Sequence, residues 1–226
     1  MPVLPGPPAL EITLRRSARA RRFSLRVSAL DGKVTLTLPP RAREAEAMAF
    51  ARTQEDWLRA ALTRISPGEL VTMGSEIPFE GNLLRINPGS GRALRVEDGQ
   101  LLVPGDPAQA GPRVAAWLKA RARDRLAAAS DHYAAQVGRK VTQVALRDTR
   151  SRWGSCSAEG RLMYSWRLIL APPRVLDYVA AHEVAHLVEM NHSPAFWAVV
   201  GRLFPGWQAQ RAWLRGQGSQ LHGYRF

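Results

Sequence analysis

Three of the five histidines in this 226-residue chain lie within eleven residues, between His182 and His192. Two of them flank a glutamate in the run His182-Glu183-Val184-Ala185-His186. Four residues advance an α-helix by about 400°, so both imidazoles project from nearly one face and can bind a single ion. Glu183 stands beside them, where it can take a proton from a metal-bound water without binding the metal itself. The spacing predicts a zinc-dependent hydrolase.

The third metal ligand is less sharply defined than the first two, because a catalytic zinc ion has three protein ligands and one open position for water. We expect His192 to be this ligand, folded back by a helix end near Asn191, a residue type that adopts the left-handed conformation. Glu189 is the alternative, although three ligands along one straight helix converge poorly at ~2 Å from one ion. Cys156 is the only cysteine, so a multi-cysteine zinc module is excluded.

Hydrophobic patterning indicates which elements position these residues. Alternating residues between 10 and 38 predict a β-meander, residues 41–62 have the spacing of a helix, and residues 70–103 return to short strands cut by glycines and prolines. Further along, we expect a helix over 112–137, strands over 141–147 and 162–170, and helices over 174–190, from 194 to the break at 205–206, and over 207–214.

The composition changes at residues 104–112, where short strands give way to a long helical pattern. We therefore expect two domains: a β-rich N-terminal domain with one long helix over 1–108, and a metal-binding domain over 109–226. The predicted fold class is α+β, with a short sheet beside the helix that carries the metal ligands.

Basic residues exceed acidic ones by 32 to 19, a formal net charge of +13. Arginines gather in two stretches without acidic residues, 12–30 and 190–226. This charge favours an anionic substrate or a nucleic-acid partner. No segment has the ~18 to 20 uncharged apolar residues that cross a membrane, the N-terminus lacks a secretory pattern, and the single cysteine suits a reducing compartment, so we expect a cytoplasmic protein that binds no membrane.

The segment from Arg150 to Ser157 has two interpretations. As a structural element, Gly154 permits a tight turn, Trp153 fills a gap in the core and Cys156 is a small buried hydrophobe. As a functional element, the segment forms a wall of the metal cleft, with Arg152 binding a substrate carboxylate or phosphate. No second catalytic group is visible that would make Cys156 a nucleophile.

Several linked motifs resemble the YgjP-type metal-dependent hydrolase family, which is related to the SprT and WLM metallopeptidase-like domains. The match is close over about residues 145–200 and rests on RWGSCS at 152–157, SWRLILAPP at 165–173, DYV at 177–179, HEVAHLVEMNHS at 182–193 and FW at 196–197. The resemblance implies a gluzincin-like C-terminal part in which His182, His186 and His192 bind zinc and Glu183 is the catalytic acid and base.

Three functions are compatible with these observations. The first is a zinc metallopeptidase that uses a zinc-bound water activated by Glu183. The second is a metal-dependent phosphohydrolase acting on nucleotides, which an arginine-rich cleft would suit. The third is a DNA-associated protease or binding protein, which would show salt-sensitive DNA binding that survives replacement of Glu183 by glutamine. The first is preferred, and the sequence does not indicate the oligomeric state.

Overall fold

A computed structural model describes residues 2–28, 32–63 and 68–226, and the chain divides into two compact units, Met1–Gly68 and Glu69–Phe226. The division between the units therefore lies well before the boundary expected at residue 108. The reason is that the strands after residue 69 share one core with the helices that follow them: Ile77 and Leu101 belong to the same buried cluster as Leu118 and Val179. The change of composition near residue 108 marks only the start of a helix.

The N-terminal unit contains a four-stranded sheet formed by β1 (Val3–Leu4), β2 (Leu10–Arg16), β3 (Ser24–Val27) and β4 (Val34–Leu38). The strand order is β1-β2-β4-β3, and β2 runs parallel to β4. The predicted meander is therefore wrong. Val34, Leu36 and Leu38 alternate with less buried residues along β4, and this strongly buried strand takes a central position while β3 forms an edge.

Two helices cover the buried face of this sheet where one was expected. α1 (Glu44–Thr53) and α2 (Glu55–Thr63) are separated at Gln54, whose φ of −108° and ψ of 14° depart from helical values. Ala47, Ala51 and Leu58 are fully buried in the same cluster as the β4 residues. The unit thus has its own hydrophobic core.

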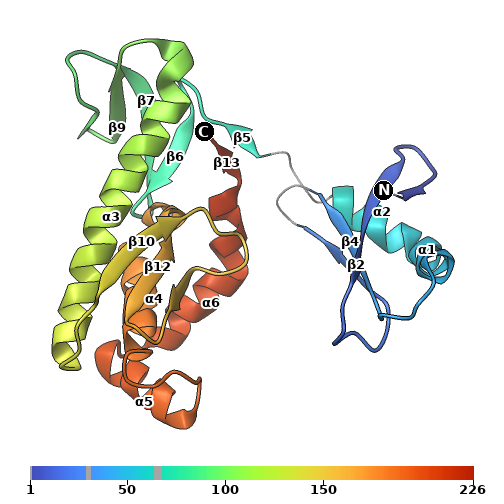
Figure 1. The fold of residues 1–226 in the computed structure, drawn as a ribbon. Helices are drawn as coiled ribbons and strands as arrows, with labels where there is room; N and C mark the ends of the chain where they lie inside the picture. Colours follow the sequence, from blue (N-terminus) through green and yellow to red (C-terminus); the bar gives the residue numbers. More distant parts are fainter. Residues whose placement is uncertain (1, 29–31, 64–67) are drawn as a thin grey trace. The chain divides into compact units, whose positions relative to one another are not determined.

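The C-terminal unit begins with strands and one long helix (Figure 1). The strands β6 (Glu76–Phe79), β7 (Asn82–Gly89), β8 (Arg95–Glu97) and β9 (Gln100–Pro104) form a sheet in the order β6-β7-β9-β8. The short helix η1 (Pro107–Gln109) leads into α3 (Ala110–Gln136), which agrees with the helix expected over 112–137. The strands β6, β7 and β9 lie at one end of α3 (Figure 1).

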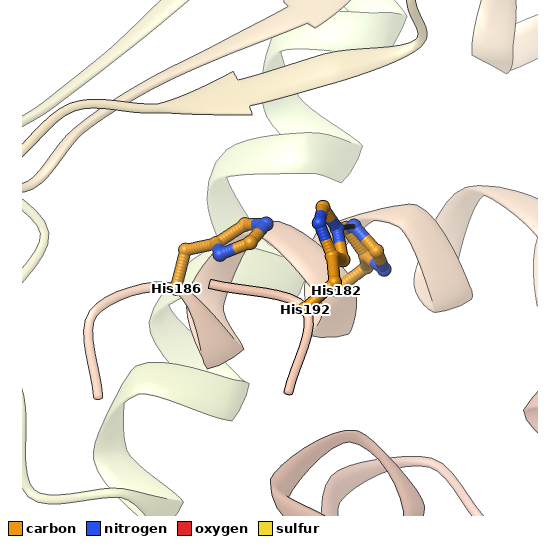
Figure 2. A group of neighbouring side chains, drawn as sticks. All are labelled: His182, His186 and His192. Carbon is orange, nitrogen blue, oxygen red and sulfur yellow. Dashed lines mark hydrogen bonds between the residues drawn. The ribbon is translucent and has the colours of Figure 1, made fainter. Parts of the chain in front are cut away.

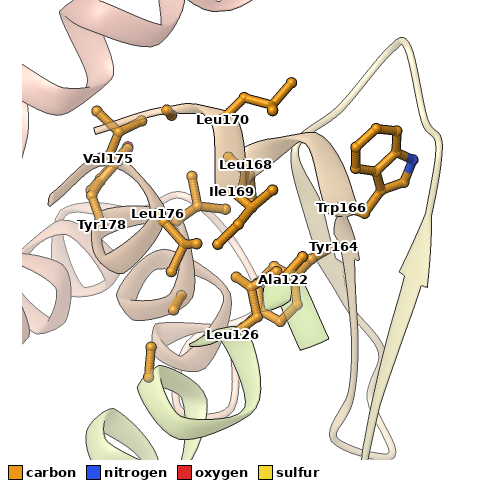
Figure 3. Packing of buried hydrophobic residues seen from close by; sticks show 14 of the residues in the cluster. Ala122, Leu126, Tyr164, Trp166, Leu168, Ile169, Leu170, Val175, Leu176 and Tyr178 are labelled. Carbon is orange, nitrogen blue, oxygen red and sulfur yellow. The ribbon is translucent and has the colours of Figure 1, made fainter. Parts of the chain in front are cut away.

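A second sheet lies nearer the other end of α3 and consists of β10 (Gln143–Arg147), β11 (Gly154–Cys156) and β12 (Arg161–Ser165). Its order is β10-β12-β11, with β11 antiparallel to β12 at one edge. The strand expected over 162–170 ends at Ser165, and residues 166–170 form the 3₁₀ helix η2. All five η2 residues are buried, and Leu168, Ile169 and Leu170 lie close to Leu176 in the apolar core (Figure 3). A short, mostly apolar run of this kind does not distinguish strand from helix.

Three helices and the chain end complete the unit: α4 (Pro173–Ala185), α5 (Pro194–Leu203), α6 (Trp207–Gln217), the 3₁₀ helix η3 (Gly218–His222) and β13 (Tyr224–Arg225). β13 pairs in parallel with β5 (Glu69–Leu70), so the end of the chain returns to the beginning of the unit. The fold is α+β, as expected, with six α-helices among the described residues. None of these helices has the length and apolar composition that crossing a membrane requires.

Arg167 holds the end of the chain against the core. Its side chain, on a residue only 9% exposed, donates to both carboxylate oxygens of Asp148 at 2.7 and 3.1 Å. It also donates to the carbonyl oxygens of Leu221 and Tyr224, each at 3.0 Å. The guanidinium thereby links the β10 end, η2 and the C-terminal segment.

Replacing Arg167 with methionine is expected to lower the free energy of unfolding by about 2 to 4 kcal/mol, because two carbonyls and one carboxylate lose a charged donor. Urea denaturation followed by tryptophan fluorescence measures this change. The matched control is Arg92→Met, since Arg92 is exposed and forms no ion pair with any residue that the structure describes. Equal free energies of unfolding for the two variants would contradict the proposed contribution of the Arg167 hydrogen bonds to stability.

Candidate metal centre

α4 carries the first two histidines and the glutamate. The helix begins after Pro172, with Pro173 in the first turn, where the missing N–H of proline costs no hydrogen bond. Most of its residues are buried, so its orientation is set by core packing. The helix ends at Ala185, with His186 as its C-cap, and not at Met190 as the pattern predicted. His182 and His186 still lie one turn apart.

His192 returns toward α4 through a short turn. Val188 and Glu189 both donate their backbone N–H to the Ala185 carbonyl oxygen, at 3.1 and 3.0 Å. Asn191 does not have a positive φ, so the expected left-handed conformation is wrong: the helix ends earlier and the turn needs no such residue. The Ser193 hydroxyl then caps α5 by accepting from the Phe196 N–H, which places His192 just before the helix.

The three histidine side chains point toward one another (Figure 2). One nitrogen from each lies within 4.8 Å of the others, and Nε2 of His182 is 3.1 Å from Nε2 of His192. Two nitrogens bound to one tetrahedral zinc ion, each at ~2.0 to 2.1 Å, lie roughly 3.3 Å apart. The distance between His182 and His192 therefore fits a shared metal ion, and the His186 nitrogen lies close to both.

The chemical state of the imidazoles also fits a metal. Burial, followed by the nearby His186 and His192, lowers the pKa of His182 to about 3, and burial lowers the pKa of His186. His186 donates Nδ1–H to the Glu189 carbonyl oxygen at 3.0 Å, so its Nε2 carries the lone pair. Neutral imidazoles with a free lone pair are the form that binds metal.

Phe196 holds the three rings together. It is fully buried, and its ring centroid lies 4.4 Å from that of His186, 4.7 Å from that of His192 and 4.9 Å from that of His182. The sequence indicated only that Phe196 packs in the core. Its contact with all three imidazoles depends on the turn that returns His192, so helical spacing alone did not show it.

Glu183 lies on the side of α4 that faces β11. The residue is only 5% exposed, and burial raises the pKa of its carboxyl to about 8, opposed by the positive charge of Arg152. A Cβ atom added to Gly154 would stand 2.5 Å from the Glu183 carboxylate oxygen Oε1, so only glycine fits this contact. Gly154 thus does more than permit a turn: it makes room for Glu183.

A cavity of about 300 Å³ opens beside Glu183 and His182. Side chains of α4 and α6 and the start of β11 line it, namely Trp153, Gly154, Tyr178, Val179, His182, Glu183, Arg211, Leu214 and Arg215. Trp153 and Gly154 of the segment 150–157 therefore form part of the cleft wall, as the functional interpretation of this segment predicted. Glu183 and one of the three clustered histidines share a space large enough for part of a substrate.

Three other side chains with ionisable groups, on Cys156, Tyr164 and His222, have surroundings that keep them out of the centre. Burial raises the pKa of the Cys156 thiol to about 11, so this residue is not an activated nucleophile. Tyr164 is fully buried and hydrogen-bonded to Ser130 at 2.9 Å, which removes it from the cleft. His222 packs on Trp153, with ring centroids 5.1 Å apart, and is not part of the histidine group.

The competition between His192 and Glu189 can be decided by metal content. Because the His192 imidazole lies in the histidine group and the Glu189 carboxylate does not, His192→Ala is expected to lose bound metal and Glu189→Ala to retain it. Inductively coupled plasma mass spectrometry of both purified variants measures the metal-to-protein ratio. Metal lost from Glu189→Ala but kept by His192→Ala would reverse the assignment.

An α+β fold that brings three histidines together next to a buried glutamate defines a metal-dependent hydrolase. The chain belongs to the YgjP-like metallopeptidase family, whose domain model matches residues 21–217. It is also similar to the crystal structure of the metallopeptidase zymogen of Pyrococcus abyssi abylysin, with 22% sequence identity, a TM-score of 0.37, and coverage of 41% of this chain and 95% of that chain. No curated protein matches the sequence.

Proposed function

We propose that the protein is a zinc-dependent peptidase in which His182, His186 and His192 hold the ion and Glu183 is the general base and acid. The observation that carries this proposal is the convergence of three imidazoles, two of which have Nε2 atoms 3.1 Å apart, next to a buried carboxyl group that shares a cleft with His182. Membership of a metallopeptidase family supports it.

In the proposed reaction, the metal ion and the side chains of the protein have separate roles. When bound, zinc supplies Lewis-acid polarisation of a carbonyl and lowers the pKa of water. Glu183 takes the proton from the attacking water and passes it to the leaving nitrogen as the peptide bond breaks. Its carboxylate form is favoured when the histidines hold a cation, because a nearby positive charge lowers a carboxyl pKa.

The edge strand β11 favours a peptide over a phosphate ester. β11 pairs only with β12 in the described part of the chain, so its other edge has no strand partner, and we propose that an extended peptide pairs with it. The catalytic cleft lies at its Gly154 end, and a second cavity, lined by residues that include Ser157, Gly160 and His186, lies beyond its other end. A peptide added to this edge would run from the cleft that contains Glu183 toward the second cavity.

The test of this function compares substrates under metal control. We expect the zinc-loaded protein to cleave casein or fluorogenic peptides, to lose this activity after chelation and to regain it with added zinc. A panel of nucleoside triphosphates is assayed in parallel. Turnover of triphosphates without any cleavage of peptides would refute the peptidase proposal and favour a phosphohydrolase.

A further inference from the structure

Two arginines of α6 line the cleft that contains Glu183. Arg211 and Arg215 are one helical turn apart, so their side chains project from one face of the helix. Glu183 is the only acidic residue among the lining side chains. The cleft is therefore positive opposite the group proposed to move the proton.

Neither guanidinium has an acidic partner among the residues that the structure describes. No hydrogen bond or ion pair involves Arg211 or Arg215 within the part of the chain that the structure describes. The sequence explains why, since residues 190–226 contain no aspartate or glutamate. Arginines that stabilise a fold are commonly paired, as Arg167 is with Asp148. These two keep their N–H donors available for a ligand.

Aromatic rings hold Arg211 in position. Its guanidinium carbon lies 4.8 Å from the ring centroid of Trp197 and 5.7 Å from that of Trp207. These two tryptophans stack on each other with ring centroids 4.3 Å apart. The ring centroid of Trp197 also lies 5.7 Å from that of His182. Stacking orders a guanidinium while leaving its edge free for a bidentate hydrogen bond to a carboxylate. Little side-chain entropy then remains to be lost on binding.

From this arrangement we infer that Arg211 and Arg215 bind a carboxylate of the substrate, so that the enzyme prefers peptide bonds near an acidic side chain or near a free C-terminus. The inference rests on the proposed peptidase function and names its substrate class. The chemistry recognised is the same in both cases, a carboxylate close to the scissile bond, and the source is distinguished by the substrates tested.

The experiment uses one quenched fluorogenic peptide sequence in four forms: with aspartate or asparagine near the cleavage site, and with a free or amidated C-terminus. The proteins are the zinc-loaded wild type, Arg211→Gln, Arg215→Gln, the double variant, and Arg202→Gln as control. Arg202 is an exposed arginine of α5 in the same acid-free stretch, and it does not line the cleft.

We expect kcat/KM of the wild type to be roughly 10- to 100-fold higher for a carboxylate peptide than for its neutral counterpart, the range for hydrogen bonds to a charged group. The ratio should fall to about one in the double variant and stay at the wild-type value in Arg202→Gln. A ratio is insensitive to partial unfolding, because both substrates meet the same folded fraction. If amidation of the C-terminus abolishes the higher kcat/KM, the recognised carboxylate is the free C-terminus. If replacement of aspartate by asparagine abolishes it, the recognised carboxylate is the acidic side chain.

Equal wild-type turnover of carboxylate and neutral peptides, or an unchanged ratio in the double variant, would overturn the inference. Binding of the same peptides to zinc-loaded Glu183→Gln, by fluorescence anisotropy, separates it from the proposed function. If no peptide is cleaved but carboxylate peptides still bind more tightly in a way that requires Arg211 and Arg215, the peptidase function fails and the carboxylate site stands. If peptides are cleaved and bound without preference, only the carboxylate site fails.

Discussion

Replacing Glu183 with glutamine is expected to lower kcat/KM for a peptide substrate by roughly 10²- to 10⁴-fold, the contribution of a general acid and base. Glutamine has nearly the same shape but accepts no proton, so the water is no longer activated and the leaving nitrogen is no longer protonated. Bound zinc should be retained, because the proposed ligands are the three histidines. Steady-state kinetics and metal analysis of the same preparation measure both effects.

The matched control is Glu189→Gln, which removes a carboxylate from the same stretch of chain. The Glu189 contact to His186 is made by its backbone oxygen, so the substitution leaves this bond in place. Activity and metal content of this variant should equal those of the wild type. Wild-type turnover by Glu183→Gln would remove Glu183 from the mechanism, whereas loss of zinc together with activity would show that Glu183 acts on the metal and not on the proton.

The parts of the centre that follow from helical periodicity could be predicted from the sequence. The proximity of His182, Glu183 and His186 could be predicted because it requires only that these residues lie on one helix. His192 was expected to join them, but through a left-handed Asn191 that the structure does not contain. The contact of Gly154 with Glu183 joins a strand to a helix about thirty residues later in the chain. No local pattern encodes such a contact, because it depends on how β11 packs on α4.

The same limit applies to the fold. Alternating apolar residues predicted the strands β2, β3 and β4, because each strand's burial depends on its own residues. Their order could not be predicted, since the parallel pairing of Ile12 with Val34 is decided by which strand buries most surface. The domain boundary expected at residue 108 differs from the division in the structure for a related reason. The strands β6, β7 and β9 bury their apolar residues in the same core as α3, and the composition of a segment does not indicate which elements share a core.

Gly154→Ala is expected to reduce kcat by at least about 100-fold, the cost of moving a catalytic group by roughly 1 Å. The added Cβ would lie 2.5 Å from Oε1 and 2.6 Å from Cγ of Glu183, closer than real Cβ atoms approach other heavy atoms. Since Glu183 is buried, its side chain has little space in which to retreat. Zinc should remain bound, and overpacking should cost about 1 to 3 kcal/mol of stability. Kinetics well below the unfolding temperature separate the two effects.

Gly216→Ala is the matched control, because a Cβ atom at this α6 position would meet no atom within 4 Å apart from its chain neighbours and the nearby backbone of its own helix. Alanine there should leave activity unchanged and raise stability by up to about 1 kcal/mol, as in other helices. The decisive comparison is the double variant Gly154→Ala with Glu183→Gln. If the alanine acts by displacing the Glu183 carboxylate, the double variant should be no slower than Glu183→Gln alone, because the group that the alanine displaces no longer contributes. A further loss equal to that of Gly154→Ala in the wild type would show that Gly154 acts on turnover independently of Glu183.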